Sequence, residues 1–165
     1  MDEMLTLAVS DASYAGMPGG ASQGGMAIAF ADPKIIDGEA TLVIVDISSC
    51  KIKRVVRASM GAEISNGTTT YEHGDYVRAA LAEMTCPDFE LKKWRRFASR
   101  WQQILVIDAK CGYDSLNSDL TPTDKRTAID IAVLRQSLMD PEYNSLVRWV
   151  PGLEMLSDGL FKTSD

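Results

Sequence analysis

The sequence predicts an α/β protein with a mixed β-sheet that carries helices on its faces. Short apolar segments with strand-like alternation come three in a row near the N-terminus, and the later segments alternate between helical and strand patterns. A run of strands followed by such alternation is typical of a sheet that contains both antiparallel and parallel pairs.

The N-terminal part of the chain predicts three successive strands. Residues 5–10 form an apolar, weakly alternating strand, and residues 26–31 and 40–46 follow as the second and third. The segment 16–25 is rich in Gly, Pro and Ser, and we expect it to be the hairpin loop between the first two strands. Residues 51–58 either continue the third strand or form a short additional one.

The middle of the chain favours helix. One helix is expected over residues 61–84, although Asn66 and the residues after it have weak helix propensity, and Pro87 requires the helix to end before it. Asp88 is expected to cap a second helix over residues 89–101. The apolar residues of that helix recur at helical spacing, and they are Leu91, Trp94, Phe97 and Trp101.

The C-terminal part alternates between strand and helix. The expected elements are a buried strand over residues 103–108, a short helix over 112–116, a long helix to Met139, a strand over 146–150 and a helix fragment over 156–162. Thr123 or Asp124 provides the N-cap of the long helix. No repeat or linker interrupts the sequence, so we expect a single domain over residues 1–165.

The composition is that of an ordinary globular domain, with 45% hydrophobic and 24% charged residues. A net charge of −6 argues against a protein that coats nucleic acid by long-range attraction alone, but it is compatible with a nuclease whose carboxylates bind cations. The acidic N-terminus and the short apolar runs predict neither a secretory signal nor a membrane span, so an intracellular protein, cytoplasmic or nuclear, is expected. The three cysteines have no CxxC spacing, and we expect reduced, partly buried thiols.

Three of the expected strands end in an aspartate after an apolar run, at Asp11, Asp46 and Asp108. An ionised carboxylate at the edge of a core is costly unless it is paired or binds a metal. Two such strands lying side by side would bring their aspartates together, and a divalent cation would offset the repulsion. The alternative is that each aspartate only caps the following turn. The pattern does not separate Asp46 from the other two.

Two further acids also have structural explanations. Glu63 is expected in the first turn of the long helix, where a negative charge interacts favourably with the helix dipole. Asp158 follows Ser157 at the start of the last helix fragment, where it can stabilise the helix N-terminus.

Six short segments together span nearly the whole chain and carry a more specific pattern. They are V-S-D-A-S-Y-A-G (9–16), S-Q-G-G (22–25), V-R-A-S-M-G-A-E (56–63), V-I-D-A-K-C-G-Y-D-S-L (106–116), T-D-K-R to D-I-A-V-L-R (123–135), and W-V-P to L-S-D-G-L-F-K (149–162). In this order they resemble the ribonuclease H domain at the end of copia-type LTR-retrotransposon polyproteins.

The resemblance implies a ribonuclease H-like fold, a five-stranded mixed sheet flanked by helices, and an enzyme that hydrolyses the RNA strand of RNA–DNA hybrids. It assigns Asp11, Glu63, Asp108 and Asp158 as catalytic metal ligands and leaves Asp46 outside the site. Two Mg²⁺ ions, or Mn²⁺ in their place, would lie roughly 4 Å apart, one activating a water and the other stabilising the leaving 3′ oxygen. The products would carry 5′-phosphates, and contacts to 2′-hydroxyls would select RNA. The implied partner is the reverse transcriptase domain of the parent polyprotein.

Some features depart from this family pattern. Met60 and Gly61 replace commoner polar residues, and the His-rich loop of cellular relatives is absent before Asp158. His73 lies about 15 Å along the expected helix from Glu63 and is expected on the surface. The alternative function is a domain that has lost catalysis and acts as a nucleic-acid-binding or interaction module. A third is a related nuclease or integrase core that acts on DNA.

The expected helix over residues 89–101 also carries basic residues, including Lys92, Lys93, Arg95 and Arg96. The aromatic spacing indicates a packed amphipathic helix, with phosphate contacts as a secondary role of its basic face. Asp130 is expected to be a structural acid that pairs with an arginine, such as Arg126 four residues earlier on the same helix face.

Overall fold

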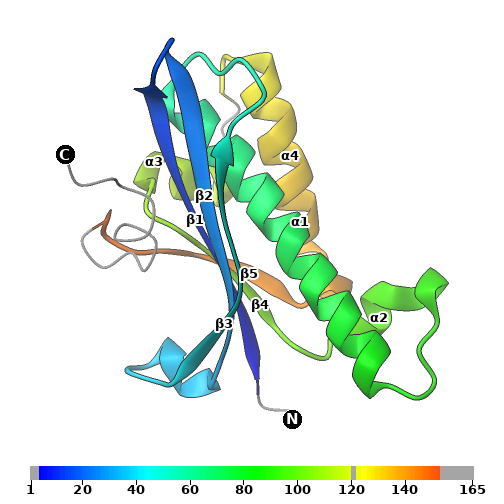
Figure 1. Cartoon of the computed structure of the whole chain (residues 1–165). Coiled ribbons are helices and arrows are strands. Elements are labelled where there is room, and N and C mark those ends of the chain that lie inside the picture. Colours follow the sequence, from blue (N-terminus) through cyan, green and yellow to red (C-terminus); the bar gives the residue numbers. More distant parts are fainter. Residues whose placement is uncertain (1–3, 120–121, 153–165) are drawn as a thin grey trace.

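The computed structural model describes residues 4–119 and 122–152, which form a five-stranded mixed sheet flanked by helices (Figure 1). The strands are β1 (Leu5–Met17), β2 (Ala21–Ala31), β3 (Leu42–Lys51), β4 (Gln103–Ile107) and β5 (Ser145–Trp149). They are arranged in the order β3-β2-β1-β4-β5. The β1–β2 and β2–β3 pairs are antiparallel, whereas β1–β4 and β4–β5 are parallel. The predicted α/β class and mixed sheet are confirmed.

The β1–β2 hairpin is longer than the sequence pattern predicted. Most of the expected loop over residues 16–25 is strand, because β1 continues to Met17 and β2 begins at Ala21. The turn is short, and Gly19 and Gly20 in it adopt φ angles of 79° and 72°, which glycine takes without strain. The prediction failed because the residues beyond Asp11 in β1 are mostly small and exposed, and the start of β2 contains Gly24 and Gly25, so neither segment has an alternating apolar pattern.

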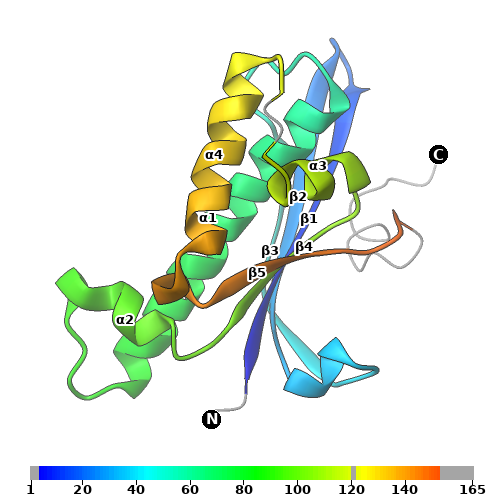
Figure 2. The same ribbon diagram turned by 180° about the vertical axis from the view of Figure 1, so that it is seen from behind.

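The helices are α1 (Ser59–Thr85), α2 (Trp94–Ala98), α3 (Lys110–Leu116) and α4 (Lys125–Met139), and 3₁₀ turns occur at Pro33–Ile36, Leu91–Lys93 and Pro141–Tyr143. Helix α1 runs along one face of the sheet, and α4 lies beside it on the same side in both views (Figures 1 and 2). Helix α2 lies at the C-terminal end of α1. The β1–β2 hairpin rises beside the N-terminal end of α1 (Figure 1).

Helix α1 is continuous through the stretch of weak propensity that begins at Asn66. The hydroxyls of Thr68 and Thr69 donate to carbonyls four residues earlier, at 2.9 and 3.1 Å, and so remain compatible with the helix. On either side, Ile64 and Tyr71 are buried in a core cluster that includes sheet residues. Tertiary packing therefore outweighs the unfavourable local propensity.

The helix expected over residues 89–101 is shorter and irregular. A 3₁₀ turn precedes the five residues of α2, and Asp88 caps neither element. Phe97 and Trp101 are buried together with Cys86, as the aromatic spacing predicted, but Leu91 is 74% exposed. Because α2 covers only residues 94–98, the helical spacing of apolar residues does not correspond to one helix over the whole predicted range of 89–101.

Other boundaries differ in detail. Strand β3 ends at Lys51, so residues 52–58 form neither a continuation nor an additional strand. The N-cap of α4 is Asp124, as predicted, and its side chain accepts from the Thr127 backbone N–H at 2.9 Å. The helix fragment expected over residues 156–162 lies outside the described residues.

The cysteines are free thiols, and only Cys86 is buried. Cys50 and Cys111 are exposed, so the expectation of partial burial was wrong for these two residues. Within residues 4–119 and 122–152, none of the helices combines the length and apolar composition of a membrane span.

Candidate metal centre

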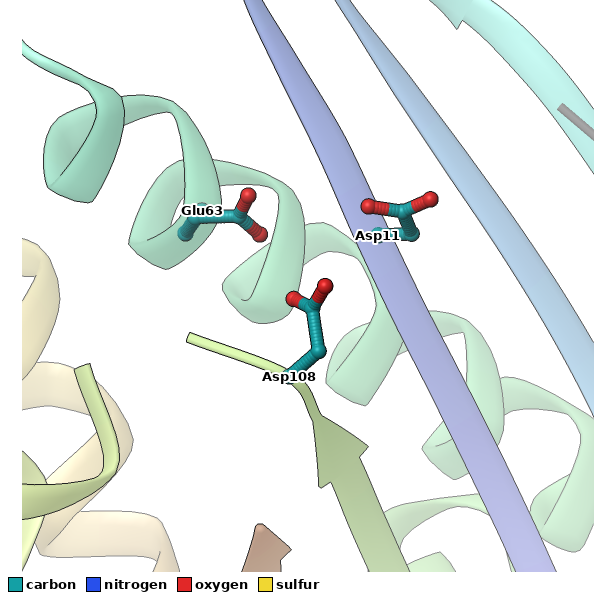
Figure 3. A group of neighbouring side chains, drawn as sticks. All are labelled: Asp11, Glu63 and Asp108. Atoms are coloured by element: carbon teal, nitrogen blue, oxygen red, sulfur yellow. The ribbon is translucent and has the colours of Figure 1, made fainter. Parts of the chain in front are cut away.

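Three carboxylates converge although they are far apart in the sequence. Asp11 comes from β1, Glu63 from α1 and Asp108 from the end of β4, and their side chains point toward one another (Figure 3). Each residue offers a carboxylate oxygen that lies within 4.8 Å of those of the other two. Asp11 is buried, whereas Glu63 and Asp108 are partly exposed. The cluster is therefore partly accessible to solvent.

The sheet order explains why the two aspartates meet. Strands β1 and β4 are parallel neighbours, and Ser10 pairs with Ile107 in their shared ladder. The residue that follows each of these two is an aspartate, so Asp11 and Asp108 lie side by side at the carboxyl ends of the paired segments. Helix α1 packs across β1 and brings Glu63 to the same place.

Glu63 lies beyond the first turn of α1, because the helix begins at Ser59. The expectation of a first-turn glutamate was therefore wrong. A favourable interaction with the helix dipole falls off within that first turn, so it gives little reason for an acid at this position. The position of Glu63 is better explained by the carboxylates that it faces in Figure 3.

The donor set suits a hard divalent cation. Carboxylate oxygens are the ligands that Mg²⁺, Mn²⁺ and Ca²⁺ prefer, whereas Zn²⁺ sites more often contain Cys or His. Three such carboxylates repel one another when they are ionised, and a divalent cation offsets that repulsion. The cluster of Asp11, Glu63 and Asp108 can therefore hold a metal ion.

The fourth acid of the expected set, Asp158, lies outside the described residues. The described chain nevertheless returns to the site after β5. A Cβ atom added at Gly152 would lie 3.4 Å from Oδ2 of Asp108, so the backbone at Gly152 passes close to this carboxylate. Asp158 follows six positions later in the sequence.

Asp46 is not part of the acidic cluster. It lies on the edge strand β3, which β2 separates from β1, and its Oδ2 is 3.6 Å from Nδ1 of His73. Both side chains are close to half exposed, and His73 is a surface residue of α1, as expected. The strand-then-aspartate pattern alone did not distinguish Asp46, whereas the strand order does.

Asp130 pairs with Arg54 rather than with Arg126. Nη1 of Arg54 donates to both carboxylate oxygens of Asp130, at 2.8 and 2.7 Å, and this interaction raises the pKa of Arg54. The expectation of an arginine partner is confirmed. The suggested residue, Arg126, was wrong because helical spacing considers only partners on the same helix. The actual partner is in the segment that precedes α1.

The basic residues predicted to contact nucleic acid lie around α2, near the end of α1 that is remote from Glu63 (Figure 1). Two of them already have partners. The Arg95 guanidinium lies 5.1 Å from the Trp94 ring centroid and 4.8 Å from that of Tyr143. Nζ of Lys93 is 2.8 Å from Oε1 of Glu90. Lys92 and Arg96 are exposed.

A second basic group lies closer to the acids and was not identified from the sequence. Arg57, Lys125 and Arg126 are exposed, and they line a surface depression of about 510 Å³ at the N-terminus of α4. Arg57 and Arg126 also line a smaller depression that includes Gly61, two residues before Glu63. These residues fall in two separate segments of the family resemblance, but no local pattern grouped them, because the packing of α4 against α1 brings them together.

Trp149 supports the backbone of one acid. Its indole N–H donates to the Asp108 carbonyl at 2.8 Å, and Nζ of Lys110 lies 5.5 Å from the centroid of its ring. The end of β5 is thereby tied to the end of β4. Trp149 was part of the family resemblance, but no local pattern indicated a role for it.

A separate buried ionic group lies farther along α1. Arg78 is 1% exposed and donates to Asp75 and to the carbonyls of Trp101 and Tyr143, the latter two at 2.8 and 3.0 Å. Burial raises the pKa of Asp75, and the Arg78 charge opposes that rise. Burial also raises the pKa of Tyr71 to about 12. Arg78 thus joins α1 to the segments around β4 and β5.

A cavity of about 690 Å³ lies near this ionic group, between α1, α2 and α4. Asp75, Trp94 and Tyr143 are among the residues that line it, and none of the three clustered acids is. The cavity is therefore separate from the candidate metal centre.

Comparisons of the chain with known protein families, with curated proteins and with solved structures found no match.

Proposed function

We propose that the chain is a metal-dependent endoribonuclease with a ribonuclease H-like fold, which hydrolyses the RNA strand of RNA–DNA hybrids. The observation that carries this proposal is the convergence of Asp11, Glu63 and Asp108 within 4.8 Å. The proposed fold requires a five-stranded mixed sheet with helices, and the observed sheet is compatible with it. The proposed family rests on the resemblance of six ordered segments to the ribonuclease H domains of copia-type retrotransposons.

In the proposed site, Asp11, Glu63 and Asp108 hold Mg²⁺, and Asp158 is the fourth acid. Bound divalent cations supply an activated water and offset the charge that develops on the scissile phosphate. The protein provides a fixed set of oxygen ligands at the junction of β1, β4 and α1. Glu63 and Asp108 are partly exposed, so a substrate phosphate can approach the cluster from their side, while Asp11 is buried behind them.

Positive charge for the nucleic-acid backbone is proposed to come from two places. Arg57, Lys125 and Arg126 lie near the N-terminal end of α1. Lys92 and Arg96 belong to the segment around α2, which lies at the C-terminal end of α1 (Figure 1). Both groups are available for phosphate contacts, which set the position of the duplex but carry no sequence information. Recognition of RNA is proposed to depend on its 2′-hydroxyls. A reverse transcriptase domain is the proposed partner.

A cleavage assay tests the proposal. An RNA–DNA hybrid with a labelled RNA strand is incubated with the protein in Mg²⁺ and, separately, with a chelator. Double-stranded DNA of the same sequence is the control substrate. We expect cleavage of the RNA strand only with Mg²⁺ and only in the hybrid, with 5′-phosphate products.

Two other outcomes would contradict the proposal. Hybrid binding without cleavage, unchanged by the metal, would favour the alternative of a binding module. Cleavage of double-stranded DNA would favour a DNA nuclease instead.

A further inference from the structure

Asn66 lies one helical turn after Glu63, and its side-chain amide joins three elements. The residue is 8% exposed, and Nδ2 donates to Oγ of Ser10 at 2.8 Å, to the Asp11 carbonyl at 2.9 Å and to the Gly25 carbonyl at 2.8 Å. An amide NH₂ has two hydrogens, so these three acceptors share two donors. The amide group of Asn66 thus links α1 to both β1 and β2.

We infer that Asn66 is a positioning residue that fixes Asp11 relative to Glu63 and thereby sets the metal affinity of the cluster. The inference rests on the proposed metal site. Asp11 and Gly25 are directly paired in the β1–β2 ladder, and Asn66 binds the backbone carbonyl of both. The turn of α1 that follows Glu63 therefore holds the β1–β2 pair at Asp11, the residue that carries the buried carboxylate.

Gly24 makes this arrangement possible. A Cβ atom added at Gly24 would lie 2.0 Å from Oδ1 of Asn66, closer than any real contact. The Asn66 side chain cannot move away without breaking the hydrogen bonds to Ser10, Asp11 and Gly25. A methyl group at position 24 should therefore displace the amide and disturb the position of Asp11.

The chain contains a matched control for this arrangement. Gln103, at the start of β4, is fully buried, and its Nε2 donates to the Tyr71 carbonyl of α1 at 3.0 Å. A Cβ atom added at Gly74 would lie 2.4 Å from Oε1 of Gln103. Gln103 and Gly74 repeat the chemistry of Asn66 and Gly24 farther along α1, without contact to a residue of the acidic cluster.

The test is a titration of the full chain with Mn²⁺ alone, followed by electron paramagnetic resonance, beside urea unfolding without metal. Both Asn66→Ala and Gln103→Ala should unfold at lower urea concentration, because each removes a buried amide that binds backbone. Only Asn66→Ala should weaken Mn²⁺ binding, by about tenfold or more, as is usual when the support of a metal ligand is removed. Unchanged Mn²⁺ affinity in Asn66→Ala, or an equal reduction in both variants, would overturn the inference.

Glycine variants keep the test decisive if Asn66→Ala does not fold. Gly24→Ala should weaken Mn²⁺ binding in the parent, and Gly74→Ala should destabilise the fold without that effect. Where the double variant folds, Gly24→Ala should not weaken Mn²⁺ binding further in the Asn66→Ala background. Gly24→Ala with parental Mn²⁺ affinity would overturn the inference.

Failure of the proposed function looks different. It would appear as a parent protein that binds no Mn²⁺, or as an Asp108→Asn variant that binds it as the parent does. Either result would also overturn the inference about Asn66, because no metal affinity would then depend on the cluster.

Discussion

Asp11 follows Ser10 and Asp108 follows Ile107, and Ser10 and Ile107 are paired on the neighbouring parallel strands β1 and β4. Their carboxylates therefore meet where the paired part of β1 and β4 ends. Glu63 of α1 completes the group, and each of the three residues has a carboxylate oxygen within 4.8 Å of those of the other two. Such a group is costly when all its members are ionised, and it can recover that cost by binding a divalent cation.

Replacement of Asp108 by Asn keeps the side-chain volume but removes one charged ligand. Without metal, we expect the variant to be as stable as the parent, or more stable, because the repulsion falls. Mg²⁺ should raise the melting temperature of the parent by mass action and that of the variant very little. Thermal melts with and without Mg²⁺ measure this difference, and a cleavage assay should show no activity in the variant. Equal stabilisation of both proteins would contradict the metal site.

Asp46→Asn is the control for that substitution. Asp46 also follows an apolar strand segment, but its carboxylate faces His73 on the surface rather than the acidic cluster. The variant should cleave the hybrid at nearly the parental rate and keep its stabilisation by Mg²⁺. A loss of cleavage as large as that of Asp108→Asn would show that the catalytic acids were assigned wrongly.

The double variant Arg57→Ala/Arg126→Ala tests which basic group binds the hybrid near the acids. Its hybrid affinity should fall, and the slope of log affinity against log salt should decrease by about one unit for each phosphate that is no longer neutralised. Binding measured in Ca²⁺, at several salt concentrations, provides both numbers. Lys92→Ala/Arg96→Ala is the comparison, since these residues belong to the segment around α2, at the other end of α1. An unchanged slope in the first variant would exclude phosphate binding by Arg57 and Arg126.

Arg54→Ala tests the ion pair between Arg54 and Asp130. The Arg54 side chain is 60% exposed, whereas that of Asp130 is 13% exposed. Solvent therefore weakens the attraction between the two charges, but less than for a fully exposed pair. We expect a decrease of up to about 1 kcal/mol in the free energy of unfolding, as for a well-formed surface pair. Arg126→Ala, the residue that helical spacing suggested, should not change it. Urea unfolding measures both free energies. A larger decrease in Arg126→Ala than in Arg54→Ala would show that Arg126 is the partner of Asp130.

The N-cap of α4 predicts a dependence of stability on pH. Hydrogen bonds from the backbone N–H and the hydroxyl of Thr127 lower the pKa of Asp124 below its ordinary value of 3.8. The unfolded state therefore binds the proton more readily, so this stabilisation is present above pH 3.8 and is lost as the pH falls through the folded-state pKa. Asp124→Asn retains a capping oxygen but does not titrate. Its melting temperature should fall less than that of the parent between about pH 5 and pH 2.

The local sequence determined several elements of this protein. The apolar run of β4, the long helix α4 and its cap at Asp124 depend on neighbouring residues, and a short window of sequence contains the information for them. The same is true of the aspartates that follow apolar strand segments. Local pattern therefore indicated Asp11 and Asp108, two of the clustered acids, together with Asp46, which is not in the cluster.

Only the tertiary structure decided which of these acids meet. The order β3-β2-β1-β4-β5 brings Asp108 beside Asp11 and leaves Asp46 on the edge strand, although all three share one local pattern. The pairing of Arg54 with Asp130 and the three hydrogen bonds of Asn66 likewise join residues that are far apart in the sequence. Such contacts form because burying the apolar faces of the sheet and α1 fixes the arrangement of the whole chain, and no short segment contains that information.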